Sequence, residues 1–141
     1  MLYIVIDELT DEIIQKKQQL ISNTQGSAFE RLKLLFTDFN TGELHRKLKE
    51  GFTKDLALIQ YYYTKISNSY VPLFANLIEQ GNLDGSWSCE YPTETAVFIV
   101  RGLAGVISEE RNRKDSPQDK NNRIKAYTTI VFRVLDAVKP E

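Results

Sequence analysis

Three observations predict an all-α domain of about six helices. Apolar residues recur at steps of three and four in several segments, the spacing that places side chains on one face of a helix and that no strand uses. Glycine, proline and capping residues separate these segments by short connections. The chain has 141 residues, within the usual range of one domain, with no internal repeat or low-complexity segment. We therefore expect a single domain over residues 1–141.

The longest apolar pattern runs from Phe52 to Trp87. Thr53 is its plausible N-cap, and the pattern crosses Pro72 in phase, which favours one long helix kinked there over a break with Ser69 as a new N-cap. Gly81 is expected to end the helix in a left-handed conformation. The stripe consists of Phe52, Leu56, Ile59, Tyr63, Ile66, Tyr70, Leu73 and Leu77.

The first helix is predicted over Met1 to Ile21, with one apolar face and a supporting pair between Glu12 and Lys16. No capping residue precedes it, so we expect this helix to continue from a segment upstream; a short protein with a frayed first turn is the alternative. The expected buried face is Leu2, Ile6, Leu9, Ile13 and Leu20, and the expected solvated cluster is Asp7, Glu8, Asp11 and Glu12.

The second helix begins at a capping box in which the Ser27 hydroxyl accepts from the amide of Glu30. Its expected buried stripe is Phe29, Leu32, Phe36 and Phe39. Gly42 ends it, and a short third helix is predicted over Leu44 to Glu50.

The last two helices carry more apolar surface than one contact can cover. One starts near Pro92, and the other has Ser116 as N-cap with Pro117 at the first helical position. Their main stripes are Ala96, Ile99, Val100, Leu103 and Ile107, and Ile124, Tyr127, Val131, Leu135 and Val138. Second patches are Phe98, Gly102 and Gly105, and Ala126, Ile130 and Ala137. We interpret the second patches as a homodimer interface. The interior glycines have no side chains and would let a helix of the partner approach closely.

Composition argues against several classes of function. The formal net charge is -1, so no global basic field would attract nucleic acid or a membrane, and the single cysteine, Cys89, rules out an intrachain disulfide. No signal peptide or membrane span is present, which favours the cytoplasm. His45 is the only histidine, and no phosphate loop or serine elbow occurs. We therefore expect no catalytic site, no metal and no cofactor.

Aromatic residues gather on or beside the expected core-facing stripes of three successive helices. Phe36, Phe39, Phe52, Tyr62 and Tyr63, together with Ile66, could line a pocket for a flat or hydrophobic small molecule. The alternative is that they simply pack as core, which aromatic residues at helical spacing usually do. The sequence does not decide between these two arrangements.

The segment from Tyr70 to Val106, YVPLFANLIEQGNLDGSWSCEYPTETAVFIVRGLAGV, resembles the tetracycline-repressor (TetR) family of transcriptional regulators. Its marks are a helix of the form P-L-x-x-x-L-I-x-Q-G, a turn with a glycine, a large apolar residue and a helix that begins at proline. Here these marks are Pro72, Leu73, Leu77, Ile78, Gly81, Gly85, Trp87 and Pro92. The likeness extends over the whole chain, where Met1 to Ile21 resembles the helix that follows the DNA-binding head.

This resemblance implies a regulatory domain without the helix-turn-helix. The final two helices would form a four-helix bundle with a second copy, and the preceding helices would enclose a small-molecule effector. Effector binding would shift residues 1–21 and so act on operator DNA through an N-terminal domain absent from this sequence. A helical protein-interaction module without a ligand is the alternative function.

Overall fold

The computed structural model describes residues 2–37, 55–110 and 116–137. The helices in these ranges are α1 (Leu2–Asn23), α2 (Ala28–Thr37), α4 (Leu56–Asp84), α5 (Pro92–Glu110) and α6 (Pro117–Val134). No strand occurs in the described ranges, so the all-α prediction is confirmed. The predicted short helix over Leu44 to Glu50 lies outside the described residues.

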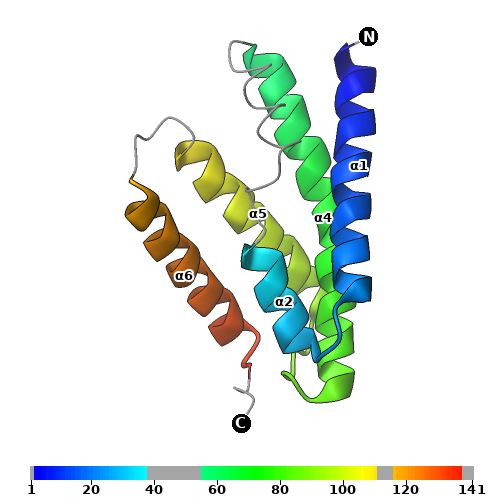
Figure 1. Cartoon of the computed structure of the whole chain (residues 1–141), viewed down its shortest axis with the longest axis vertical. Coiled ribbons are helices and arrows are strands. Elements are labelled where there is room, and N and C mark those ends of the chain that lie inside the picture. The colour runs from blue at the N-terminus through cyan, green and yellow to red at the C-terminus, as the bar shows by residue number, and fades with distance from the viewer. Residues whose placement is uncertain (1, 38–54, 111–115, 138–141) are drawn as a thin grey trace.

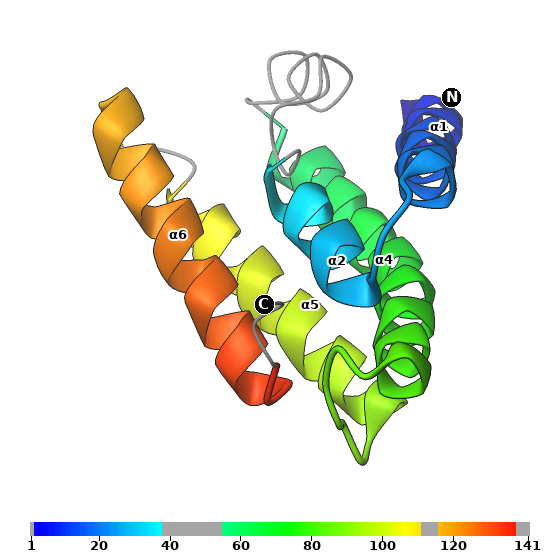
Figure 2. The same cartoon turned by 60° about the horizontal axis from the view of Figure 1, so that its bottom comes forward.

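Helix α4 is the centre of the fold. It contacts α1, α2 and α5. Figures 1 and 2 show α1 running parallel to α4, α5 running antiparallel to α4, and α6 running in the opposite direction to α5. Helix α2 contacts α1 and α4 on one side and α6 on the other. Each helix therefore covers a different side of one interior.

The core is made largely of the apolar faces that the sequence predicts, but Leu56 of the long stripe is 71% exposed and Phe29 of the second helix is only half-buried. Each fully buried large apolar side chain stabilises the folded state by about 1.5–3 kcal/mol, so the buried side chains of these faces supply most of the hydrophobic stabilisation. The most deeply buried are Ile6, Leu32, Leu35, Phe74, Leu77, Ile78, Ala96 and Leu135. On α5, the predicted face of Ala96, Ile99, Val100 and Leu103 is confirmed.

Helix α1 faces the interior differently from the prediction. Its buried residues are Ile6, Thr10, Ile13, Lys17 and Ile21, whereas Leu9 and Leu20 are only half-buried. Thr10 is accommodated because its hydroxyl donates to the Asp7 carbonyl at 2.9 Å. The predicted solvated cluster is correct for Glu8, Asp11 and Glu12, and wrong for Asp7, which is half-buried against α4. The Glu12 and Lys16 side chains form the predicted pair at 3.7 Å.

Helix α4 is continuous through Pro72, so the alternative of a break with Ser69 as a new N-cap is wrong. The Ser69 hydroxyl donates to the carbonyl of Lys65 at 2.9 Å, as serine does inside a helix. The N-cap is Asp55 and not Thr53, because the Asp55 carboxylate accepts from the Ala57 amide at 3.1 Å and from the Leu58 amide at 3.3 Å. The helix thus begins later than predicted.

Gly81 does not end α4, contrary to the prediction. The helix continues to Asp84, and Gly85, with a φ of 85°, provides the left-handed C-cap. The indole of Trp87 lies directly on Gly81, where an added Cβ would be 2.0 Å from a ring carbon. The indole N–H donates to the carbonyl of Ile78 at 2.8 Å. Gly81 is thus required for a close approach of a ring rather than for its backbone freedom.

The start of α2 is held from a distant part of the chain. The Ser27 hydroxyl accepts from the Glu30 amide at 3.4 Å, as predicted. In addition, the Asp84 carboxylate accepts from the Ala28 amide at 2.7 Å, and the Ser86 hydroxyl accepts from the Phe29 amide at 3.2 Å. The last residue of α4 and the loop after it therefore satisfy backbone donors that α2 cannot pair internally.

Replacing Asp84 with alanine is expected to lower the free energy of unfolding by about 1 kcal/mol, the usual cost of losing a capping acceptor. Burial raises the pKa of this carboxyl, but hydrogen bonds from Ser86 and Ala28 outweigh burial and bring it below its ordinary value of 3.8. The contribution is therefore complete above the unfolded-state pKa and is lost as the pH falls through the lower folded-state pKa. Urea unfolding at neutral pH and at about pH 3 should show the difference shrinking in acid.

The control for this prediction is Glu90→Ala, which removes an exposed carboxylate from the same loop. It should change the free energy of unfolding by less than about 0.5 kcal/mol at either pH. A loss in Asp84→Ala that is the same at both pH values would show that the carboxylate charge is not responsible.

The last two helices begin where the sequence predicts. Pro92 is the first residue of α5. Ser116 caps α6, accepting from the Asp119 amide at 3.2 Å, with Pro117 at the first position. In α6, Val131 and Leu135 of the predicted stripe are buried, while Ile124 and Tyr127 are half-buried. Val138 and the side chain of Ile107 lie outside the described parts of the chain.

Candidate functional site

An aromatic cluster occupies the interior between α2 and α4. We define it by Phe36, Tyr62, Tyr63, Ile66, Tyr70 and Phe74. All except Tyr63 are buried, and Tyr63 is half-buried and packs against the others. The structure thus places four of the predicted pocket residues, Phe36, Tyr62, Tyr63 and Ile66, in one core cluster. The other two, Phe39 and Phe52, lie outside the described residues.

The rings of the aromatic cluster meet in edge-to-face and tilted arrangements. The ring centroids of Phe36 and Phe74 are 6.1 Å apart with an interplanar angle of 77°. Those of Tyr70 and Phe74 are 6.2 Å apart at 68°, and those of Tyr62 and Tyr63 are 5.3 Å apart at 57°. Such pairs add about 0.5–1.5 kcal/mol beyond the area that they bury. Phe74 therefore joins the ring of α2 to the rings of α4.

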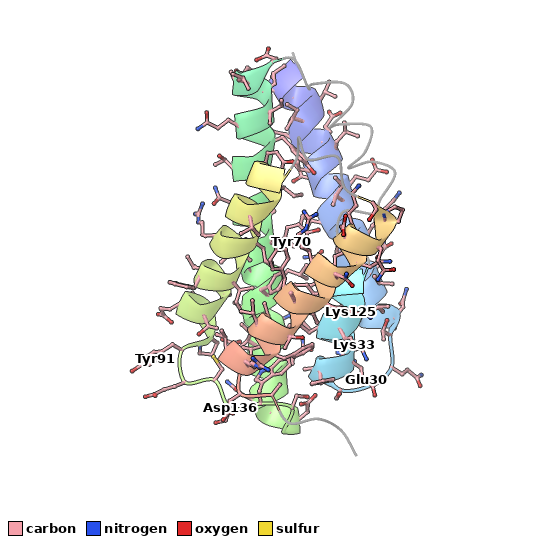
Figure 3. All side chains as sticks on the ribbon, turned by 90° about the vertical axis from the view of Figure 1, so that its left-hand side faces the viewer. Glu30, Lys33, Tyr70, Tyr91, Lys125 and Asp136 are labelled. Atoms are coloured by element: carbon pink, nitrogen blue, oxygen red, sulfur yellow. The ribbon has the colours of Figure 1, made fainter. Side chains whose placement is uncertain are left out.

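Two members of the aromatic cluster, Tyr70 and Phe74, were not predicted as pocket residues. Tyr70 lies on the predicted stripe of the long helix, and Figure 3 shows it midway along α4, with the other helices around it. Phe74 follows Tyr70 by four residues and so lies on the same face. The helical period alone could have identified both.

The tyrosines bring neutral hydroxyl groups into this apolar interior. Burial raises the pKa of Tyr62, and the neighbouring phenols of Tyr70 and Tyr63 raise it further. The Tyr62 phenol therefore keeps its proton at physiological pH. Ring surfaces combined with neutral hydroxyl groups are suited to a flat, largely apolar molecule that carries a few hydrogen-bonding atoms.

A second candidate site is a set of exposed apolar residues on α5 and α6, which we call the outer face. Phe98 is 81% exposed, Ile130 55% and Val134 56%. A Cβ added at Gly102 or Gly105 would meet nothing within 4 Å in the described chain, so these glycines face open space. The outer face comprises Val97, Phe98, Gly102, Gly105, Ala126, Ile130 and Val134.

The outer face contains five of the six residues predicted for a dimer interface. Ala126 is exposed, whereas Ala137 is half-buried and packs against the protein's own core. Val97 and Val134 were not predicted. Val134 follows Ile130 by one helical turn, and Val97 adjoins Phe98, so extension of the same patches would have found them.

Helix α6 is attached to the domain mainly through its second half. Val131 and Leu135 are buried, and the ring of Phe132 stacks on that of Phe29 at 4.4 Å with an interplanar angle of 20°. No residue from 116 to 126 is buried within the described structure. The side chains in the first half of α6 are therefore largely open to solvent.

Other chemical features of the described residues are few. They contain no group of three or more histidine, cysteine or acidic residues that could hold a metal ion. The thiol of Cys89 is half-buried and donates to the Thr95 hydroxyl at 3.3 Å. His45 lies outside the described ranges. None of the described helices has the length and hydropathy that a membrane span requires.

Comparison of the sequence with models of known protein families gave no match, and neither did comparison with curated proteins.

Proposed function

We propose that this chain is the effector-binding and dimerisation domain of a TetR-like transcriptional regulator. The observation that carries the proposal is the outer face, because a monomer leaves the large apolar residues Phe98, Ile130 and Val134 in water. Two antiparallel helices that each present such residues could form a four-helix bundle with the same helices of a second copy. Gly102 and Gly105 would let the partner's helices approach closely.

The aromatic cluster is the proposed effector site. It combines ring surfaces from α2 and α4 with the hydroxyl groups of Tyr62 and Tyr70, and α4, which supplies most of its residues, also contacts α1. An effector held there would be a small hydrophobic or aromatic molecule. Its binding would alter how α1 packs on α4, provided that it binds the two positions of α1 with different affinity. DNA contact would belong to a head domain joined to α1, and no metal or other cofactor enters this mechanism.

The first test is a thermal-shift screen of the purified chain against fused-ring aromatics, polyphenols and long-chain acyl compounds. A compound present at about one hundred times its dissociation constant stabilises the folded state by about 2.7 kcal/mol. Binding should also change the fluorescence of Trp87, the only tryptophan. If no compound of any of these classes changes the melting temperature or the Trp87 fluorescence, the proposed effector site is contradicted.

For a compound that binds, Phe36→Leu is expected to raise the dissociation constant by about tenfold, because the variant loses a ring from the aromatic cluster. The matched control is Phe132→Leu, which removes a ring that stacks on Phe29, outside the cluster. Both variants replace one phenylalanine by leucine, so isothermal titration can separate binding from general destabilisation. Equal loss of affinity in both variants would place the ligand elsewhere.

The alternative function is a helical interaction module that binds a protein and has no small-molecule ligand. The observation in its favour is that the rings of Phe36, Tyr70 and Phe74 contact one another. In that case the outer face would receive a helix of a different protein. A monomer in solution together with a negative ligand screen would favour this module over the regulator.

A further inference from the structure

The two ends of α1 are held on the domain in different ways. In its second half, Ile13, Lys17 and Ile21 are buried. Among the described side chains of its first two turns, Ile6 is the one large apolar residue that is buried, and Tyr3, Ile4 and Val5 are exposed. Because exposed apolar side chains bury little surface, the N-terminal end of α1 gains less hydrophobic stabilisation from its contact with the domain than the C-terminal end does.

A polar contact with α4 supplements the attachment at this end. The hydroxyl of Tyr61 donates to the Asp7 carboxylate at 2.6 Å. The rings of Tyr61 and Tyr3 meet edge to face, with centroids 4.8 Å apart and an interplanar angle of 87°. Tyr3 and Asp7 are one helical turn apart on α1, so both reach the same side chain of α4. We call these three residues the Tyr61 clasp.

The Tyr61 clasp contains a strong type of hydrogen bond. A phenol that donates to a carboxylate makes a charge-assisted bond, which is shorter and stronger than a bond between neutral groups. The bond to Asp7 raises the pKa of Tyr61, so the phenol keeps the proton that it donates. Asp7 and Tyr61 are both half-buried, hence water can replace their mutual bond when the helices separate.

The Tyr61 clasp is sensitive to the position of α1. One residue of an α-helix corresponds to about 1.5 Å along its axis and about 100° around it. A slide or rotation of α1 by one residue would therefore take Asp7 out of hydrogen-bonding range and Tyr3 off the ring of Tyr61. The three residues together define one height and one rotation of α1 on α4.

We propose that the Tyr61 clasp is a releasable latch that fixes the first two turns of α1 on α4. When it opens, this end of α1 separates from α4 while the part around Ile13 and Ile21 stays packed. Tyr61 is followed directly by Tyr62 of the aromatic cluster, so a displacement of α4 at Tyr62 would also move Tyr61 relative to Asp7 and Tyr3. That an effector acts through the clasp rests on the function proposed above; the latch itself is a property of the ligand-free protein.

Amide hydrogen exchange measured on the whole chain without ligand tests the latch. Tyr61→Phe removes the hydroxyl and retains the ring that meets Tyr3. We expect amides of residues 6–12 to exchange about tenfold faster, the effect of losing one hydrogen bond to a charged group. Amides of residues 17–23 should keep their rates. Tyr91→Phe, which removes an exposed hydroxyl at the foot of α5 (Figure 3), is the matched control and should change neither segment.

Asp7→Ala breaks the same bond from the α1 side and serves as the second variant. It should accelerate the same amides, and the double variant with Tyr61→Phe should exchange no faster than the more affected single variant. Equal acceleration in both segments of α1, or unchanged rates in residues 6–12, would overturn the latch. Such a result would leave the effector site standing, just as a negative ligand screen would leave the latch standing.

Discussion

Gly81→Ala is expected to lower the free energy of unfolding by about 3 kcal/mol, at the upper end of the usual cost of overpacking a core. The added Cβ would lie 2.0 Å from one carbon of the Trp87 indole and 2.3 Å from another. The ring cannot simply turn away, because its N–H donates to the buried carbonyl of Ile78 at 2.8 Å. Chemical denaturation followed by circular dichroism would measure the loss.

A double-mutant cycle provides the control for this prediction. Trp87→Ala alone should be strongly destabilising, since it empties a buried site. In that background, Gly81→Ala should be neutral or stabilising by up to about 1 kcal/mol, because alanine has the higher helix propensity. If the Gly81 substitution costs the same with and without the indole, the contact with Trp87 is not its cause.

Helix starts that depend on local chemistry could be predicted from the sequence. Ser27, Pro92 and Ser116 occupy the predicted positions because capping involves residues that are close along the chain. The N-cap of α4 was misplaced because Thr53 and Asp55 are both suitable capping residues only two positions apart, and composition does not rank them. The all-α fold followed from the helical period alone.

Contacts between distant segments could not be predicted in this way. Asp84 accepts from the amide of Ala28, 56 residues before it, and no periodic pattern links the two. The same holds for the bond from Tyr61 to Asp7, 54 residues apart, which gives an acidic residue of the first helix a role in packing. Gly81 shows a related limit, since a glycine that ends a helix and a glycine that receives a ring look alike in sequence.

The aromatic cluster was predicted in part for a physical reason. A stripe at helical spacing identifies the side of a helix that is buried, so Phe36 and Ile66 were placed correctly in the interior. Tyr62, beside the stripe, is buried as well, whereas Tyr63 on the stripe is only half-buried. A stripe does not tell which buried residues of one helix meet those of another. The pairing of Phe36 with Phe74 across α2 and α4 depends on how the two helices cross, which only the assembled fold determines.

Phe98→Glu is expected to weaken the proposed homodimer strongly, raising its dissociation constant by about a hundredfold or more. Phe98 is the most exposed of the large apolar residues of the outer face, at 81%, and in the proposed four-helix bundle it would be enclosed by the partner's α5 and α6. A carboxylate there would lose its hydration without gaining a counter-ion. In the monomer the same side chain would remain in water, so folding should be unaffected.

The matched control is Leu83→Glu, which introduces the same charge at an apolar residue that is 88% exposed but lies near the end of α4, outside the outer face. Sedimentation equilibrium should show a dimer for the wild type and for Leu83→Glu, and a folded monomer for Phe98→Glu. Gly105→Arg, on the same face, should also give a monomer, because its Cβ meets no described atom of its own chain. A wild-type monomer would contradict the dimer, and dimers of both outer-face variants would show that the partner binds to a different surface. Phe98→Glu and Gly105→Arg can leave folding intact and yet prevent dimerisation only if both residues are exposed to solvent in the monomer and buried in the dimer.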